Sequence, residues 1–201
     1  MNYLAIDASG TNLTLVVCKR DKIYKFHDAN CGVNHSVVLM NEVEKLLSEA
    51  EISPADMDFF AVVTGAGSFT GIRIGVATVK ALCFAYQKPC LNITSFDTLA
   101  YNMEGGKILA VIDAKHNGYY ACGYTDGTVT LKPCYLLKDD LLKLKGDYLF
   151  VGDFEADFID RKVEVCSGLI SAVASKKGEA TLDLDSVVPL YVRKSQAEEG
   201  R

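Results

Sequence analysis

The chain has 201 residues, of which 49% are hydrophobic, and its formal net charge is −5. This composition suits one large globular domain or two small ones and excludes a disordered chain. Nucleic-acid binding needs a basic face, so an acidic chain with scattered Lys and Arg residues is not expected to bind nucleic acid alone unless folding assembles a basic patch.

The amino-terminal residues 1–7 lack the basic and apolar regions of a signal peptide, and no stretch reaches the roughly 20 apolar residues of a membrane span. The seven cysteines form no Cys-x-x-Cys pair. These features predict reduced thiols and a cytoplasmic protein.

Apolar runs predict three strands at the start of the chain, the first beginning at Leu4. The second covers Leu13–Cys18 and the third Lys22–Phe26, with a turn between them, so the three form an antiparallel meander. Apolar residues at helical spacing then predict a helix over Leu39–Ala50. Asn34 or Ser36 could cap this helix, and Pro54 follows its end.

A buried strand is predicted at Phe59–Val63, followed by a glycine-rich loop from Gly65 to Gly75 and a helix over Ile74–Tyr86. A strand at Leu91–Ile93 and a helix near Phe96–Met103 come next. The later segments are assigned from shorter patterns: a helix at Asp139–Leu144, a strand at Tyr148–Gly152, a strand or helix at Val165–Ala174, and a strand at Leu190–Arg193.

Two stretches of the chain resemble each other. Leu4–Ser9 and Leu109–Lys115 each carry an apolar run, an Asp-Ala step and a following strand. We interpret this as an internal duplication, with lobes at residues 1–104 and 105–201 separated near Gly105-Gly106. Chance similarity of two short apolar runs is the alternative.

The glycine loop joins a strand end to a helix start, where free backbone N–H groups favour anions. Its spacing does not match a Walker loop, a dinucleotide loop or a hydrolase elbow. We therefore interpret the loop mainly as a structural corner and keep anion binding as a minor hypothesis. The residues assigned to this corner are Gly65, Gly67, Gly71, Arg73 and Gly75.

The turn that begins at Asp7 carries small and hydroxyl residues that could approach a phosphate, although they could equally satisfy the turn's own backbone. The residues assigned to a nucleotide or phosphate site are Asp7, Ser9, Thr11, Ser68 and Thr70. His27, His35 and His116 are isolated in the sequence, so we expect neither a metal site nor a catalytic residue.

The helix over Ile74–Tyr86 is apolar nearly all round, and Lys80 is its only charge. Small residues at Ala77, Ala81 and Ala85 would let another helix approach closely. One face should pack on the sheet, and the other needs cover either from the Leu39–Ala50 helix or from a partner. The residues assigned to a partner interface are Leu39, Val43, Leu46, Ile74, Ala77, Lys80, Ala81 and Phe84.

The run from Gly65 to Gly75 resembles the signature Gly-Pro-Gly-Ser-Phe-Thr-Gly-Leu/Val-Arg-Ile-Gly of the bacterial TsaB (YeaZ) family. The chain departs from it at Ala66, where the family usually has proline, a change expected to loosen the turn without altering the fold. Further matches lie at Leu4–Ser9, Asn34–Ser36, Val111–Lys115 and Pro189–Arg193.

The resemblance implies an α/β ASKHA (actin-like/Hsp70-like ATPase) fold of two duplicated ribonuclease-H-like lobes, the second smaller and degenerate, with dimerisation helices in the first. It also implies a non-catalytic role beside the catalytic subunit TsaD and the ATPase TsaE. Their complex makes threonylcarbamoyladenosine in tRNAs that read ANN codons, so this chain would meet tRNA only through the complex, away from any membrane. A homodimer is expected when the chain is alone. No intrinsic cofactor is expected, and ATP or ADP would bind at the TsaD or TsaE junction.

The competing hypothesis is a small actin-like ATPase or sugar-kinase-like enzyme that uses Asp7, Ser9 and Thr11 on phosphates.

Overall fold

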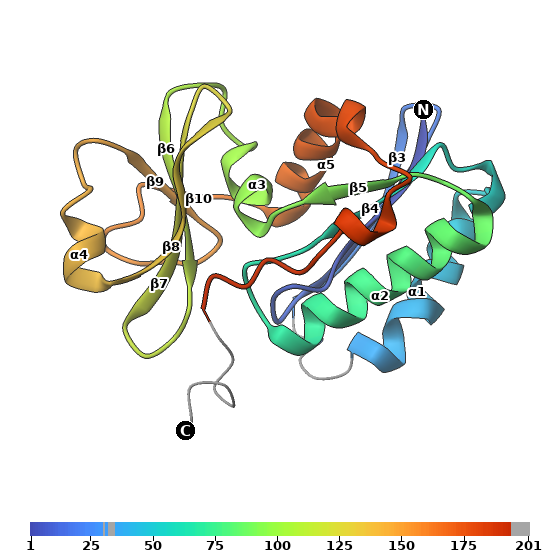
Figure 1. Ribbon diagram of the computed structural model, residues 1–201, viewed down its shortest axis with the longest axis horizontal. Helices are drawn as coiled ribbons and strands as arrows, with labels where there is room; N and C mark the ends of the chain where they lie inside the picture. Colours follow the sequence, from blue (N-terminus) through green and yellow to red (C-terminus); the bar gives the residue numbers. More distant parts are fainter. Residues whose placement is uncertain (30, 32–34, 194–201) are drawn as a thin grey trace.

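Two five-stranded mixed sheets form the framework of the protein, shown in Figure 1. The structure is a computed structural model and describes residues 1–29, 31 and 35–193. The first sheet has the order β3-β2-β1-β4-β5 and the second β10-β9-β6-β7-β8. The strands of the first sheet are β1 Asn2–Asp7, β2 Leu13–Lys19, β3 Lys22–Asp28, β4 Phe59–Val63 and β5 Cys90–Ile93. Those of the second are β6 Lys107–Asp113, β7 Gly118–Thr125, β8 Thr128–Leu137, β9 Leu149–Gly152 and β10 Arg161–Lys162.

Strands β1, β2 and β4 of the first sheet are buried on both faces, which explains why they are almost continuously apolar, whereas the edge strand β3 is exposed or half-buried. Leu4 and Ile6 of β1 point toward helices α1 (His35–Glu49) and α2 (Phe69–Tyr86). Tyr3 and Ala5 point the other way, toward α5 (Val165–Lys176). Alternate residues of a strand face opposite sides, so one strand contributes to two separate cores.

The second sheet repeats the topology of the first. β1 and β6 are each antiparallel to the next strand in the chain, and that strand is antiparallel to the third. Each is also parallel to the fourth strand, which pairs in parallel with the fifth. This shared topology confirms the duplicated α/β fold expected from the sequence.

The helices distinguish the two lobes. The second sheet has only the short α4 (Lys138–Leu142) where the first has α1, and the link between β9 and β10 contains no helix. Helix α3 (Ser95–Ala100) follows β5 but packs on the second sheet, while α5 follows β10 but packs on the first. Figure 1 shows these two helices between the sheets. The boundary predicted between residues 104 and 105 lies between α3 and β6 and stays a prediction.

Two predicted elements differ from the structure, and one strand was missed. Helix α2 begins at Phe69 rather than Ile74, because Ser68 accepts a hydrogen bond from the backbone N–H of Gly71 and caps the helix. Strand β8 was not predicted. Leu190–Arg193 is not a strand: its backbone joins the first lobe through Leu190, whose N–H donates to the carbonyl of Thr64 at 2.7 Å.

Two ambiguous assignments are settled and one is not tested. Val165–Ala174 is helical, as part of α5. Ser36 lies inside α1 and does not cap it, and Asn34 lies outside the described residues. Pro54 begins the short 3-10 helix Pro54–Asp56 after α1.

Helix α2 is the only helix in the described part of the chain that is long and apolar enough to cross a membrane. Core helices of globular proteins share this length and composition. Here α2 packs along β4 and contributes Ile72, Val76 and Val79 to the core.

Candidate functional site

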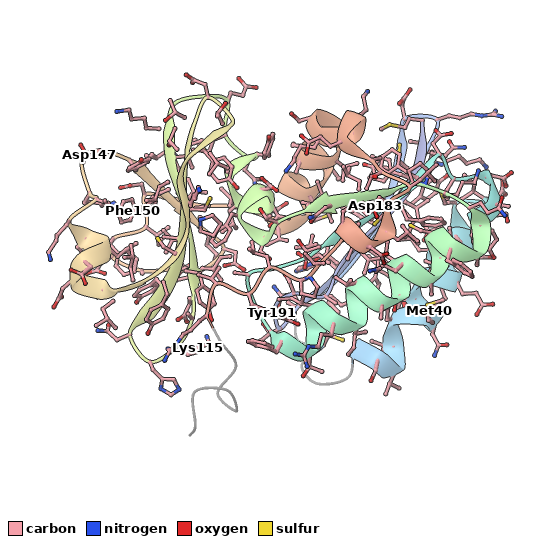
Figure 2. All side chains as sticks on the ribbon, in the orientation of Figure 1. Met40, Lys115, Asp147, Phe150, Asp183 and Tyr191 are labelled. Atoms are coloured by element: carbon pink, nitrogen blue, oxygen red, sulfur yellow. The ribbon has the colours of Figure 1, made fainter. Side chains whose placement is uncertain are left out.

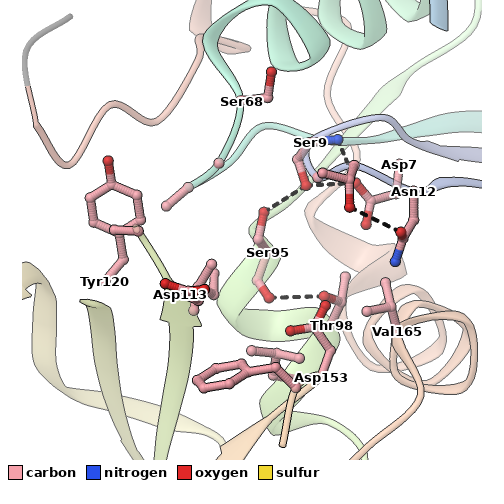
Figure 3. A pocket seen from close by; sticks show the side chains of 18 of the residues that line it. Asp7, Ser9, Asn12, Ser68, Ser95, Thr98, Asp113, Tyr120, Asp153 and Val165 are labelled. Atoms are coloured by element: carbon pink, nitrogen blue, oxygen red, sulfur yellow. Dashed lines mark hydrogen bonds between the residues drawn. The ribbon is translucent and has the colours of Figure 1, made fainter. Parts of the chain in front are cut away.

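A cleft with a volume of about 520 Å³ lies between the two lobes. Its walls include the two duplicated turns, from Asp7 in the first lobe and from Asp113 in the second, as Figure 3 shows. The structure also brings Ser9, Thr11 and Ser68 to this cleft. The exposed Thr70, on the first turn of α2, is not among its lining residues.

The first-lobe turn is closed by its own hydrogen bonds. Oδ1 of Asp7 accepts from the backbone N–H of Ser9 at 2.8 Å and from its hydroxyl at 2.6 Å. The Ser9 hydroxyl also lies 2.9 Å from that of Ser95, and all three residues are buried. This arrangement matches the structural interpretation of the turn, in which Asp7 and Ser9 satisfy local groups.

The second-lobe turn repeats the backbone hydrogen bond to its aspartate, although Lys115, unlike Ser9, has a positive φ angle, of 66°. The N–H of Lys115 donates to Oδ1 of Asp113 at 2.8 Å, and its ammonium contacts Oδ2 at 2.8 Å. Burial alone would raise the pKa of Asp113, but the contacts with Lys115 outweigh it and hold this pKa below its usual value. On the same cleft, burial raises the pKa of Asp153, and the charge of Asp113 raises it further.

Carboxylates dominate the charge of the cleft. Asp7, Asp113 and Asp153 line it, and Lys115 is the one cation among the described residues of its walls. This balance disfavours a polyphosphate, which needs cations or unpaired backbone donors. Within the described residues, no three His, Cys, Asp or Glu side chains gather as metal ligands do.

Sequence reasoning missed several cleft residues, among them Ser95, Thr98, Tyr120 and Asp153. A signal was available for two of them. Ser95 and Asp153 closely follow parallel strands β5 and β9, and the carboxyl ends of parallel strands meet at one edge of a sheet.

The glycine loop is a tightly packed corner against the first-lobe turn. The N–H of Ser68 donates to the carbonyl of Ser9 at 2.6 Å, and that of Ser95 to the carbonyl of Gly65 at 2.7 Å. A Cβ at Gly67 would collide with the Ser9 carbonyl, and one at Gly71 with the Ala8 carbonyl. Gly65 and Gly67 also have positive φ angles, of 112° and 153°. These positions therefore need glycine for close backbone approach.

Helix α2 presents an apolar face that α1 does not cover. Ala77, Ala81 and Ala85 are exposed, and Phe84 is 81% exposed. Ile74 is half-buried against the core, and the half-buried Lys80 donates to the carbonyl of Val187 at 3.4 Å. Within residues 1–29, 31 and 35–193, no element covers this second face of α2.

Three residues assigned to the interface lie in the core instead. Leu39, Val43 and Leu46 are buried on the side of α1 that faces the first sheet. Their helical spacing reflects packing within the chain, because the apolar side of an amphipathic helix is the side that faces the core. The exposed apolar residues of α1 are Val37 and Met40, and Figure 2 shows Met40 on α1 beside α2.

Residues 26–177 match the family model described as "TsaD: tRNA N6-adenosine threonylcarbamoyltransferase". The chain is similar to proteins named tRNA threonylcarbamoyladenosine biosynthesis protein TsaB. It is 34% identical to that of Bacillus subtilis over 60% of this chain and 53% of the relative, so the match spans about half the length of that protein. It is 28% identical to that of Buchnera aphidicola over 75% of this chain and 77% of the relative.

Among solved structures, the chain is similar to YeaZ from Pseudomonas aeruginosa. The TM-score is 0.77 at 23% identity, covering 94% of this chain and 99% of that one. This likeness concerns the fold, including both lobes.

Proposed function

The chain belongs to the TsaD family of tRNA N6-adenosine threonylcarbamoyltransferases, in its TsaB/YeaZ branch, and from this premise we propose that it acts in tRNA threonylcarbamoyladenosine biosynthesis as the non-catalytic partner of the transferase subunit TsaD. In this role it binds and supports TsaD while TsaD transfers the threonylcarbamoyl group to adenosine. TsaE joins the complex, and any ATP or ADP binds at the TsaD or TsaE junction.

The exposed apolar face of α2 is the observation that carries this proposal. Phe84 is 81% exposed and lies in line with the exposed Ala77 and Ala81. Contact between such an apolar surface and water is unfavourable, so its presence indicates a surface that a partner covers. The alanines keep this face shallow, so a helix of another chain can approach closely while Phe84 inserts beside it. Val37 and Met40 of α1 extend the face along its neighbour.

TsaD is the occupant that fits this face best. It shares the fold of this family, so it carries helices that correspond to α1 and α2 and can meet them as a helical bundle. When the chain is alone, the same face would pair two copies of it, which gives the homodimer. The interface residues we propose are therefore Ala77, Ala81 and Phe84, joined by Val37 and Met40.

The cleft supports a non-catalytic role. Both duplicated aspartates accept hydrogen bonds from their own turns, and carboxylates outnumber cations along the walls. Carboxylates that already accept hydrogen bonds from backbone N–H groups of their own turn, and N–H groups that already donate them, are poorly placed to bind a magnesium ion or phosphate oxygens.

Reconstitution tests the proposal. The chain should co-purify with TsaD of the same organism, and threonylcarbamoyl transfer to tRNA by TsaD and TsaE should depend on its presence. Transfer at the same rate without the chain would overturn the proposal.

The interlobe cleft with two aspartate turns favours one alternative, a small ATPase or sugar-kinase-like enzyme acting through Asp7, Ser9 and Thr11. Turnover by the purified chain separates the two. Robust ATP hydrolysis that is lost in the Asp7→Asn variant would favour the enzyme.

A further inference from the structure

The carboxyl-terminal segment Val187–Arg193 crosses from the first lobe to the second and touches the start of α2. The carbonyl of Val187 accepts from Lys80, and the N–H of Leu190 donates to Thr64 beside the glycine corner. Leu190 and Val192 pack with the core of the second lobe. Arg193 lies over the ring of Tyr135 on β8, 4.7 Å from its centroid. We call this segment the strap.

Tyr191 attaches the strap to α2 through its ring and its hydroxyl. Its ring stacks on that of Phe69 with centroids 4.3 Å apart and planes 9° apart. Its hydroxyl accepts a hydrogen bond of 2.8 Å from Nε of Arg73. The Arg73 guanidinium also lies 5.5 Å from the Phe69 centroid and 5.6 Å from that of Tyr191, within cation–π range. Figure 2 places Tyr191 at the amino-terminal end of α2.

This cluster lies on the same face of α2 as the exposed apolar stripe. Residues spaced by three, four, seven or eleven along a helix share a face, so Arg73, Ala77 and Phe84 lie in one row. Arg73 and Tyr191 are themselves exposed, Tyr191 by 39%. The cluster of Phe69, Arg73 and Tyr191 therefore extends the proposed interface to the amino-terminal end of α2.

We infer that Tyr191 is a positioning residue for the docking of TsaD. By stacking on Phe69 and bonding Arg73, it orders the first turn of α2 and the strap before the partner arrives. Without the ring, these side chains must be immobilised during binding, at an entropic cost that weakens the complex. The strap also links this end of the interface to the second lobe. This inference rests on the proposed function.

The test compares three variants in binding to purified TsaD. Tyr191→Leu removes the stack and the hydrogen bond, whereas Tyr191→Phe keeps the stack and loses only the hydrogen bond. Tyr148→Leu is the matched control, because Tyr148 is a partly buried tyrosine packed in the second lobe, away from α2. Dissociation constants come from titration calorimetry well below the melting temperature, which is measured separately for each chain.

We expect Tyr191→Leu to weaken binding about tenfold, equivalent to about 1.4 kcal/mol. Tyr191→Phe should recover most of that affinity, and Tyr148→Leu should bind like the wild type even where its melting temperature falls. Binding of Tyr191→Leu within twofold of the wild type would overturn the inference, and so would an equal loss in Tyr148→Leu. If the wild-type chain itself does not bind TsaD, the proposed function fails instead.

Discussion

The two lobes share one strand order but differ in the helices that cover them. In the part of the chain that the structure describes, the first sheet carries the long helices α1 and α2 on one face, whereas the corresponding face of the second has only the five-residue α4. The exposed apolar stripe thus lies on an element that the second lobe lacks. The comparison indicates that the framework is present twice, while the surface that we propose for a partner lies on one copy.

The duplicated turns differ in a similar way. In the first lobe, Asp7 is buried and bonded to a serine that reaches Ser95 on α3. In the second, Asp113 is half-exposed and paired with an exposed lysine. Equivalent aspartates therefore hold the first turn through a buried network and the second through a surface ion pair, which should contribute much less to stability.

The strongest test of the asymmetry between the lobes is a charge on the stripe of α2. Ala81→Glu should weaken binding to TsaD at least about a hundredfold, because a buried, unpaired carboxylate loses its hydration. Gel filtration and titration calorimetry measure the effect. The fold of the variant should be unchanged, since Ala81 is exposed in the isolated chain.

Ala174→Glu is the matched control, an exposed alanine on α5. It should bind TsaD like the wild type. If Ala81→Glu and Ala174→Glu behave alike, the stripe is not the docking surface.

The lobes are joined where α3 meets α5, and Gly168→Ala tests this junction. A Cβ there would collide with the carbonyl of Thr98 and the side chain of Asn102. We expect a loss of about 1–3 kcal/mol in the free energy of unfolding, as in other overpacked sites. Urea unfolding measures it.

Gly178→Ala provides the comparison, because a Cβ at Gly178 meets nothing within 4 Å. Its effect should stay within about 0.5 kcal/mol, as for ordinary surface changes. Equal losses in the two variants would argue against tight packing of α3 on α5.

The two turns can be compared by replacing each aspartate with asparagine. Asp7→Asn should cost about 1–2 kcal/mol of unfolding free energy, because it weakens a buried charge-assisted network. Asp113→Asn should cost less than about 1 kcal/mol, as for an exposed pair. Both variants should still support threonylcarbamoyl transfer in the reconstituted complex. Loss of transfer in a folded Asp7→Asn variant would instead indicate a catalytic cleft.

The smallest effect is on protonation within the second-lobe turn. The pKa of Asp113 is held below 3.8, so its stabilising contribution is present above that pH and lost as the pH falls through the lowered pKa. The pKa of Asp153 in the folded protein is raised by burial and by the charge of Asp113, so folding favours the protonated carboxyl. The stability that this group contributes is therefore lost as the pH rises through its raised pKa. Carboxyl NMR titration should show Asp113→Asn lowering the pKa of Asp153. An unchanged pKa would mean that the two carboxylates do not interact.

The buried strands of the two sheets could be predicted because buried strands form continuous apolar runs in the sequence. Leu13–Cys18 and Phe59–Val63 are buried along their whole length, so their pattern was unambiguous. Strand β8 was missed because it is an edge strand with exposed polar positions and Pro133 inside it, which only an edge tolerates. The start of α2 was missed because Gly71, needed for close approach to Ala8, resembles a loop residue.

The candidate surfaces were harder to predict because they depend on how elements meet in space. Apolar spacing identified α1 and α2, but it could not tell the core side of α1, with Leu39 and Val43, from its exposed side. Tyr191 and Phe69 are far apart in the sequence and meet only because the strap runs past the start of α2. The cleft likewise combines residues from both lobes.

Hydrogen exchange on this chain with and without TsaD shows which surface TsaD covers. We expect TsaD to slow amide exchange along α1 and α2, including the turn around Phe69, while the strands of the second sheet exchange as before. Unchanged exchange along α2, with protection confined to the second sheet, would contradict it.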